Sequence, residues 1–111
     1  MTYRLVVSEN VKKKIKKMDK HLGLMLAKDM KARLDKLEDP RRLGKALKGD
    51  YKGLWRYRIG SYRVICDIRD NELIVLAIDI GHGKNIYEWK RAINHKYGFS
   101  SFLTFNLILP A

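Results

Sequence analysis

The chain has 111 residues, with 24 lysines and arginines against 12 aspartates and glutamates, a formal charge of +12. This length fits one domain, and a hydrophobic fraction of 46% is enough for a core, which excludes a disordered basic tail. The single cysteine, Cys66, excludes an intramolecular disulfide, and no stretch has the roughly 20 apolar residues of a membrane span, so we expect a small basic protein of the cytoplasm that does not bind membranes.

The first half of the chain predicts a strand followed by a helical hairpin. Residues 3–7 are rich in β-branched and aromatic side chains, and Ser8 follows as a helix N-cap. Apolar residues then recur every three or four positions in two stripes, with Gly23 as the predicted break between them. The two stripes are Val11, Ile15, Met18 and Leu22, then Leu26, Met30, Leu34 and Leu37. Their apolar sides are expected to face one sheet.

Three further strands and a last helix are predicted in the second half. Residues 40–53 contain one proline and three glycines and are interpreted as a loop. The predicted strands, turns and helix are 54–59, Gly60-Ser61, 62–69, Asp70-Asn71, 72–80 and 86–97. The order β-α-α-β-β-β-α predicts an α+β domain in which the helical hairpin packs on one face of a small, largely antiparallel sheet.

The chain divides into a domain at residues 1–97 and an apolar tail at residues 98–111. All three phenylalanines of the chain lie in this tail. The sequence assigns the tail no role.

The strand predicted at 72–80 is apolar on both faces, which is typical of an interior strand. The two-residue turn before it places Cys66 opposite Val75 in the core. The helical hairpin covers one face of this strand, so the last helix or a protein partner is needed to cover the other. A small basic protein with this requirement is a candidate for an obligate complex.

Strand alternation places three arginines on one face of the central hairpin. Across the predicted turn, Arg58 is expected to lie directly opposite Arg63, with Arg56 two residues further along. Like charges directly opposed across strands destabilise a sheet. An anion between the guanidinium groups removes this repulsion, and an RNA or DNA phosphate is the obvious candidate. Asp67 shares this face but is expected to lie too far along it to neutralise the pair.

These arginines belong to a pattern that resembles the RelE branch of the RelE/ParE toxin superfamily. The resemblance rests on residues 37–42, 44–49, 54–64 and 79–82, followed by Ile86-Tyr87. RelE-like toxins of type II toxin–antitoxin systems are ribosome-dependent endoribonucleases that cut mRNA in the A site, and a cognate antitoxin wraps and silences them. The resemblance therefore implies an antitoxin, the ribosome and mRNA as partners, with operator DNA reached only through the antitoxin.

The resemblance also implies roles for single residues. Arg56 and Arg58 stand where the family has its basic strand pair, Arg63 matches its Tyr-Arg motif, and Tyr87 matches its closing tyrosine. Family members commonly carry arginine at the position of Gly83. Here the nearest cation is Lys84, so the resemblance implies one weaker phosphate contact than in other family members.

The expected reaction needs no metal and no cofactor, because RNA carries its own nucleophile, the 2′-hydroxyl. Arg58 and Arg63 are expected to stabilise the charge that develops at phosphorus. His82 is the candidate general base because its pKa lies near neutrality when unperturbed, and Tyr87 is the candidate proton donor or base-stacking group. Further RNA contacts are expected from Arg56, Lys45, Lys48, Lys52 and Lys84.

Two other functions remain open. A ParE-like toxin inhibits DNA gyrase by binding, without nuclease chemistry. A non-catalytic relative that binds RNA or the ribosome is the other alternative, and Gly83 is compatible with it. Two features favour the nuclease: the facing arginines, and the histidine and tyrosine that follow soon after the strand predicted at 72–80. A gyrase inhibitor does not require that cluster.

Overall fold

A computed structural model of the chain describes residues 1–83. The strands are β1 (Arg4–Val7), β2 (Lys45–Ala46), β3 (Leu54–Ile59), β4 (Tyr62–Arg69) and β5 (Ile74–His82). The helices are α1 (Glu9–Lys17) and α2 (Lys20–Leu34), with the short 3-10 helices η1 (Gly49–Tyr51) and η2 (Asp70–Glu72). The helix predicted at 86–97 and the tail at 98–111 lie outside the described residues. Within the described part, none of the helices has the length and apolar character needed to cross a membrane.

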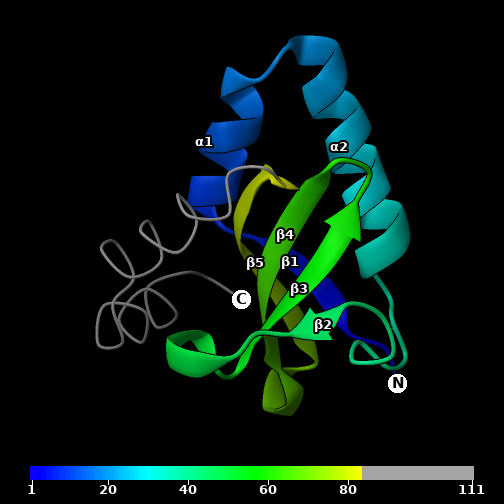
Figure 1. Cartoon of the computed structure of the whole chain (residues 1–111). Coiled ribbons are helices and arrows are strands. Elements are labelled where there is room, and N and C mark those ends of the chain that lie inside the picture. The colour runs from blue at the N-terminus through cyan, green and yellow to red at the C-terminus, as the bar shows by residue number, and fades with distance from the viewer. Residues whose placement is uncertain (84–111) are drawn as a thin grey trace.

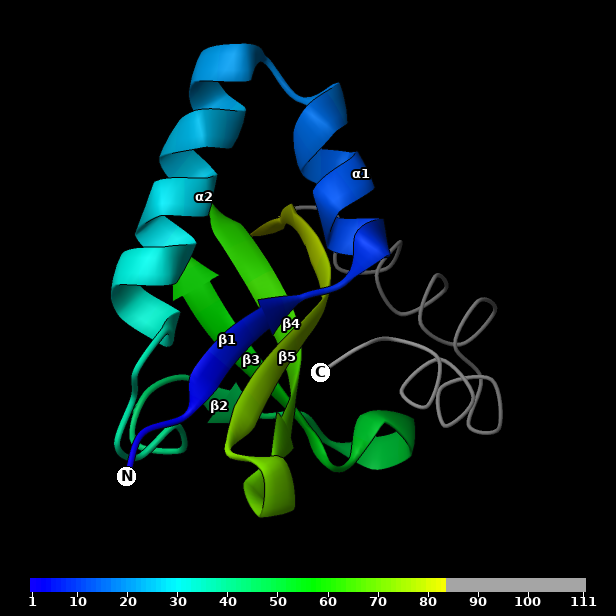
Figure 2. The same ribbon diagram turned by 180° about the vertical axis from the view of Figure 1, so that it is seen from behind.

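The strands form one five-stranded sheet in the order β1-β5-β4-β3-β2. β1 is parallel to β5, and all other neighbours are antiparallel. The two helices form a hairpin that lies against one face of this sheet (Figures 1 and 2). The predicted α+β architecture, with a helical hairpin on a largely antiparallel sheet, is confirmed.

The break between the helices lies at Met18 and Asp19, so the prediction of a break at Gly23 was wrong. Asp19 begins α2 as its N-cap, because its carboxylate accepts a hydrogen bond from the Leu22 amide at 3.2 Å. Gly23 lies inside α2, where a Cβ would be 2.9 Å from the Ile15 carbonyl oxygen. The glycine therefore permits the close approach of the two helices and does not end one.

Two apolar clusters cover the two faces of the sheet. The cluster on the helical side includes Val11, Leu26, Met30, Leu34, Tyr57, Ile59, Val64, Cys66, Val75, Ala77 and Ile80. The cluster on the other side is made of Leu54, Ile65, Ile74, Leu76 and Ile78, with Val6, Leu47 and Tyr51 packed against it. β5 contributes to both clusters and lies between β1 and β4, as expected of an interior strand.

The register between β4 and β5 differs from the prediction. η2 and Leu73, in the left-handed conformation at φ 54°, lengthen the connection, so β5 begins at Ile74. Cys66 consequently pairs with Ala77 and not with Val75. The thiol is buried all the same, and burial raises its pKa, so it stays protonated.

The segment at 40–53, predicted to be a loop, contains the edge strand β2 and the helix η1. Gly44 precedes β2 with φ 74° and lies so close to the Arg56 carbonyl that a side chain would collide with it. The Trp55 indole nitrogen donates to the Leu43 carbonyl at 2.6 Å and holds the segment against β3. A two-residue edge strand carries too little alternation to be recognised from sequence.

Candidate nucleic-acid interface

Arg58 of β3 and Arg63 of β4 are direct cross-strand partners, as predicted. The Gly60-Ser61 turn between their strands places Gly60 at φ 61°, a conformation that glycine adopts without strain. Arg58 is exposed, and its Nε donates to the Gly60 carbonyl at 3.3 Å. Arg63 is partly exposed and has Gly81 of β5 as its partner on the other side.

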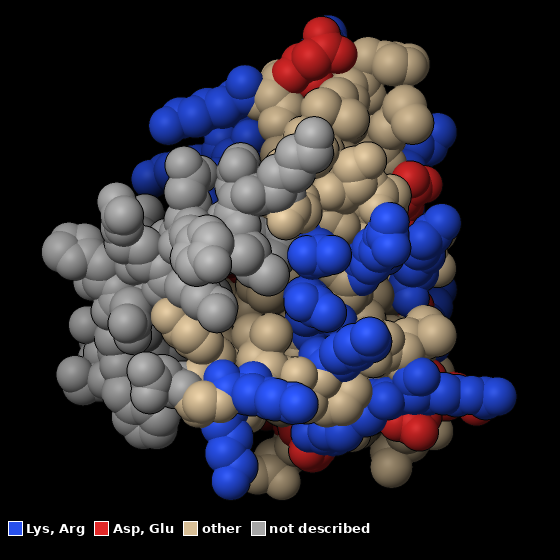
Figure 3. All heavy atoms as spheres, viewed as in Figure 1, with Lys and Arg blue, Asp and Glu red and all other residues tan. Residues whose placement is uncertain are grey.

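A second row of facing cations lies beside the first. Lys45 of β2 pairs with Arg56 of β3, and strand alternation places both on the face that carries Arg58. Figure 3 shows lysine and arginine side chains gathered on this side of the molecule, with few acidic side chains among them. Lys48 and Lys52, both exposed, flank η1 directly after β2. The sequence named these three lysines as RNA contacts, but it did not predict the edge strand β2 that places Lys45 opposite Arg56.

No carboxylate neutralises the facing arginines within residues 1–83: neither Arg58 nor Arg63 takes part in an ion pair there. Asp67 lies in the row of Leu54 and is 3.9 Å from the Nε of Arg69. Burial raises the pKa of Asp67, and Arg69 partly offsets that increase. The expectation that Asp67 is poorly placed to neutralise the pair is met, so no carboxylate of residues 1–83 relieves the repulsion between Arg58 and Arg63.

His82 lies in β5 and not in the loop after it, where the sequence placed it. It pairs with Tyr62, and the two rings meet edge to face with centroids 5.4 Å apart. Tyr62 packs on the helical-side cluster, so by strand alternation His82 belongs to that face, whereas Arg63 belongs to the opposite one. The structure thus brings His82 to the same end of the sheet as the arginines but onto the other face.

Gly83 lies beside Arg63. Its amide donates to the Ser61 carbonyl at 3.0 Å, and a Cβ at this position would be 3.7 Å from the guanidinium carbon of Arg63. The position at which family members carry arginine is therefore adjacent to the guanidinium pair. Lys84 and Tyr87, the remaining candidate site residues, lie outside the described residues.

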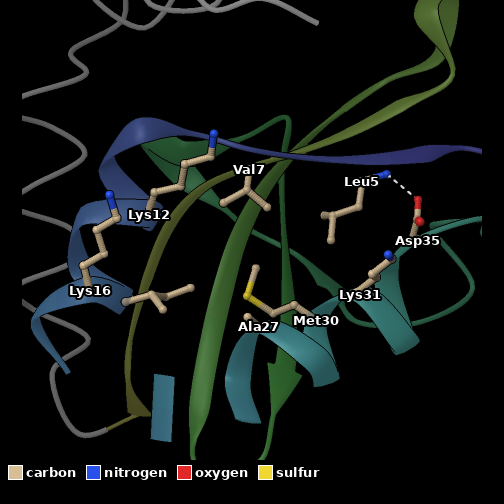
Figure 4. Close-up of a pocket in the computed structure, with 9 residues that line it drawn as sticks. Leu5, Val7, Lys12, Lys16, Ala27, Met30, Lys31 and Asp35 are labelled. Carbon is tan, nitrogen blue, oxygen red and sulfur yellow. Dashed lines mark hydrogen bonds between the residues drawn. The ribbon is translucent and has the colours of Figure 1, made fainter. Parts of the chain in front are cut away.

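A groove that the sequence analysis did not anticipate opens between α1, α2 and β1 (Figure 4). It has a volume of about 440 Å³. Its apolar lining comes from Leu5, Val7, Ile15, Ala27 and Met30, and its charged lining from Lys12, Lys16, Lys31 and Asp35. Sequence periodicity assigned Ile15 and Met30 to the core. Met30 is buried there, whereas Ile15 stays partly exposed beside the groove, which periodicity could not show.

Among the described residues, no three histidine, cysteine, aspartate or glutamate side chains come together as a metal site would require. Lys45, Arg56, Arg58 and Arg63 make the arginine face cationic, and the two carboxylates that strand pairing places on the same face, Asp67 and Asp79, lie beside Arg69 and Lys14. Such a surface is suited to binding a polyanion by charge-assisted hydrogen bonds.

Residues 5–87 match the family model described as the ParE toxin of the type II toxin–antitoxin system parDE. The chain belongs to this ParE toxin family. It is thus a toxin of the RelE/ParE superfamily, and the resemblance seen in the sequence is confirmed at that level. No curated protein sequence matches the chain.

Several solved toxins share the fold of this ParE-family chain. RelBE2 of Mycobacterium tuberculosis, a toxin–antitoxin complex, matches with a TM-score of 0.65 at 21% identity, covering 74% of this chain and 92% of that one. A mutant of E. coli RelE in the free state matches with a TM-score of 0.61 at 23% identity, covering 86% and 98%. The archaeal RelE–RelB complex of Pyrococcus horikoshii matches with a TM-score of 0.51 at 22% identity, covering 77% and 99%. At these identities the likeness shows a common fold.

Proposed function

We propose that this toxin is a ribosome-dependent endoribonuclease that cuts mRNA in the ribosomal A site and is silenced by a cognate antitoxin. The observation that carries the proposal is the pair of Arg58 and Arg63, which a tight turn sets opposite each other and which no carboxylate of residues 1–83 neutralises. Guanidinium groups on two directly facing residues can bind one phosphate through charge-assisted, directional hydrogen bonds. The second row, Lys45 opposite Arg56, extends this site along the path of an RNA backbone.

The reaction begins with attack of the RNA 2′-oxygen on the adjacent phosphorus. The 2′-hydroxyl loses its proton to a base, the bond from phosphorus to the 5′-oxygen breaks, and the leaving oxygen takes up a proton. The products are a 2′,3′-cyclic phosphate and a 5′-hydroxyl, so atoms and charge balance. Arg58 and Arg63 stabilise the dianionic pentavalent state, and Arg56 holds the neighbouring phosphate.

His82 is our candidate base and Tyr87 our candidate acid in this scheme. His82 lies at the last position of β5, at the same end of the sheet as the arginines but on the other face, so the scheme requires RNA to pass around this end of the sheet. Catalytic hydrogen bonds often become well aligned only in the complex with substrate. The free-state contact of His82 with Tyr62 would then be exchanged for one with RNA.

The experiment that tests the nuclease uses programmed ribosomes and maps the ends of the mRNA after addition of the toxin. Cuts in the A site that disappear in Arg63→Ala support the proposal. Arg33→Ala is the matched control, because it removes the same charge from an exposed position on α2. A wild-type toxin that leaves the mRNA intact contradicts the proposal.

Inhibition of DNA gyrase is the second candidate function, because the matching family model is that of the ParE toxin. The position of His82 on the helical face is compatible with a protein that binds without cutting RNA. A supercoiling assay run in parallel separates the two. Gyrase inhibition with intact mRNA supports this candidate, and neither effect supports a non-catalytic relative that binds RNA or the ribosome.

We propose the groove of Figure 4 as the docking site for an amphipathic helix of the antitoxin. Its apolar lining accepts the apolar side of such a helix. Lys12 and Lys16 line it from α1 and Lys31 from α2, so acidic residues on the borders of the incoming helix would find opposite charges on both sides.

A further inference from the structure

The C-terminal part of β5 is offset by one residue relative to β4. Cys66 pairs with Ala77, but the preceding residue of β4, Ile65, pairs with Asp79. Ile78 is therefore the extra residue of a β-bulge. Because side chains alternate between the two faces of a sheet, one extra residue exchanges the faces of all the residues that follow it.

This exchange decides which side chain lies beside Arg63. With the bulge, Gly81 is opposite Arg63, and Ile80 faces the helical-side cluster opposite Val64. An uninterrupted ladder from Ala77 would instead place Ile80 opposite Arg63 and turn Asp79 toward the helices. The bulge thus keeps a branched apolar side chain out of the arginine face and puts a glycine there.

Polar groups at the start of α1 hold the bulge. The Ile78 carbonyl accepts hydrogen bonds from the side-chain amide of Asn10 at 3.0 Å and from the Ser8 hydroxyl at 3.4 Å. One oxygen of Asp79 accepts from the Lys14 ammonium at 2.5 Å, from Asn10 at 3.2 Å and from the Ile80 amide at 2.9 Å. Both residues of the bulge are therefore bonded to the same helix.

Stability alone does not explain this arrangement. Asp79 is fully buried, and among residues 1–83 its second oxygen finds no hydrogen-bond partner. A buried ion pair with an unsatisfied oxygen is commonly less stabilising than well-packed apolar side chains in the same space. Buried polar groups of this kind can instead select one register among several.

We propose that Asp79, held by Lys14 and Asn10, is a positioning residue of the arginine face. It keeps the bulge at Ile78 and so keeps Gly81, and not Ile80, opposite Arg63. The inference rests on the proposed nuclease only for its effect on RNA cleavage, because the register of β5 can be measured without RNA.

The test substitutes Asp79→Leu, since a leucine at this position suits the uninterrupted ladder, in which residue 79 lies opposite Val64 and faces the helical-side cluster. NMR contacts across the strands report the register: Arg63 with Gly81 in the native form, Arg63 with Ile80 in the shifted one. We expect the shifted contacts, loss of the contact between the rings of Tyr62 and His82, and a fall in A-site cleavage of at least about tenfold. Asp67→Leu is the matched control on the same face and is expected to leave the register and the cleavage unchanged.

Asn10→Ala is the second variant, in case Asp79→Leu does not fold. It removes donors to both bulge residues while leaving the ion pair of Lys14 and Asp79, and we expect a mixture of the two registers with a smaller loss of cleavage. The proposal is overturned if folded Asp79→Leu keeps the native contacts of Arg63 with Gly81. If Asp79→Leu does not fold, the same contacts without a shifted form in Asn10→Ala overturn it. Full cleavage in a variant with shifted contacts would also overturn it. If the wild-type toxin does not cut mRNA, the proposed nuclease fails, and the NMR contacts still decide the role of Asp79.

Discussion

Arg58 and Arg63 face each other across the tightest turn of the sheet without a carboxylate between them in the described part of the chain. Two like charges in direct cross-strand contact raise the energy of the folded protein. A site that binds a phosphate gains from the same arrangement, because the anion bridges both groups. Function and stability therefore place opposite demands on these two residues.

The first prediction follows from this conflict. Arg58→Ala should abolish mRNA cleavage and raise the free energy of unfolding by roughly 0.2–1 kcal/mol, because it relieves the repulsion. Urea unfolding and ribosome-programmed cleavage measure the two effects, with Arg33→Ala as the charge-matched control. A clear loss of stability in Arg58→Ala would count against the geometry described for the pair.

The second prediction concerns the glycine beside Arg63. Gly83→Arg should tighten binding of a short single-stranded RNA and steepen its salt dependence by about 0.7 in the log–log slope, because one more cation reaches the phosphates. The backbone allows the change, since a Cβ at residue 83 meets Arg63 only at an ordinary contact distance of 3.7 Å. Fluorescence anisotropy at several salt concentrations measures both quantities.

Gly83→Ala is the control for that experiment, since it adds the Cβ without the charge and should leave the slope unchanged. Weaker RNA binding by Gly83→Arg would mean that repulsion from Arg63 outweighs the added contact.

The third prediction concerns acid stability. Asp70 accepts two hydrogen bonds from the Arg41 guanidinium, at 2.8 and 2.9 Å, and one from the Tyr3 hydroxyl at 2.6 Å. These bonds lower the pKa of Asp70 to about 2. Because this value is below that of the unfolded chain, the stabilisation is present above about pH 4 and is lost as the pH falls toward 2.

Asp70→Asn should therefore be less stable than the wild type at pH 6, with a difference of no more than about 1 kcal/mol because the ion pair is exposed. The difference should shrink as the pH falls from about 4 and be largely lost as it passes through about 2, in denaturant unfolding measured across that range. A difference that persists at the acid end would assign the effect to packing and not to the charge of Asp70.

The fourth prediction tests the groove. Lys16→Glu should weaken binding of the cognate antitoxin by about tenfold, because like charges would meet at the border of the docked helix. Lys13→Glu is the matched control, since Lys13 is exposed on α1 but does not line the groove. Calorimetry on the purified pair gives the affinities, and equal effects of the two variants would argue against this docking site. Both variants should retain A-site cleavage.

The helix break and the bulge of β5 could not be read from the sequence. Gly23 suggested the end of a helix, yet it permits contact with the Ile15 carbonyl, a partner that only the folded hairpin supplies. The bulge at Ile78 is held by Ser8, Asn10 and Lys14 of a segment far away in the chain. Local pattern carries no information about such partners.

The sequence alone determined the parts that depend on neighbours along the chain. Ser8 caps α1 through the Val11 amide, and the Gly60-Ser61 turn sets Arg58 against Arg63, because capping and two-residue turns are local geometries. Tertiary structure decided which face His82 occupies, that Gly81 lies beside Arg63, and that a groove stays open between the helices. These features depend on one extra residue in a strand and on the angle between two helices, and both are set by contacts between segments distant in sequence.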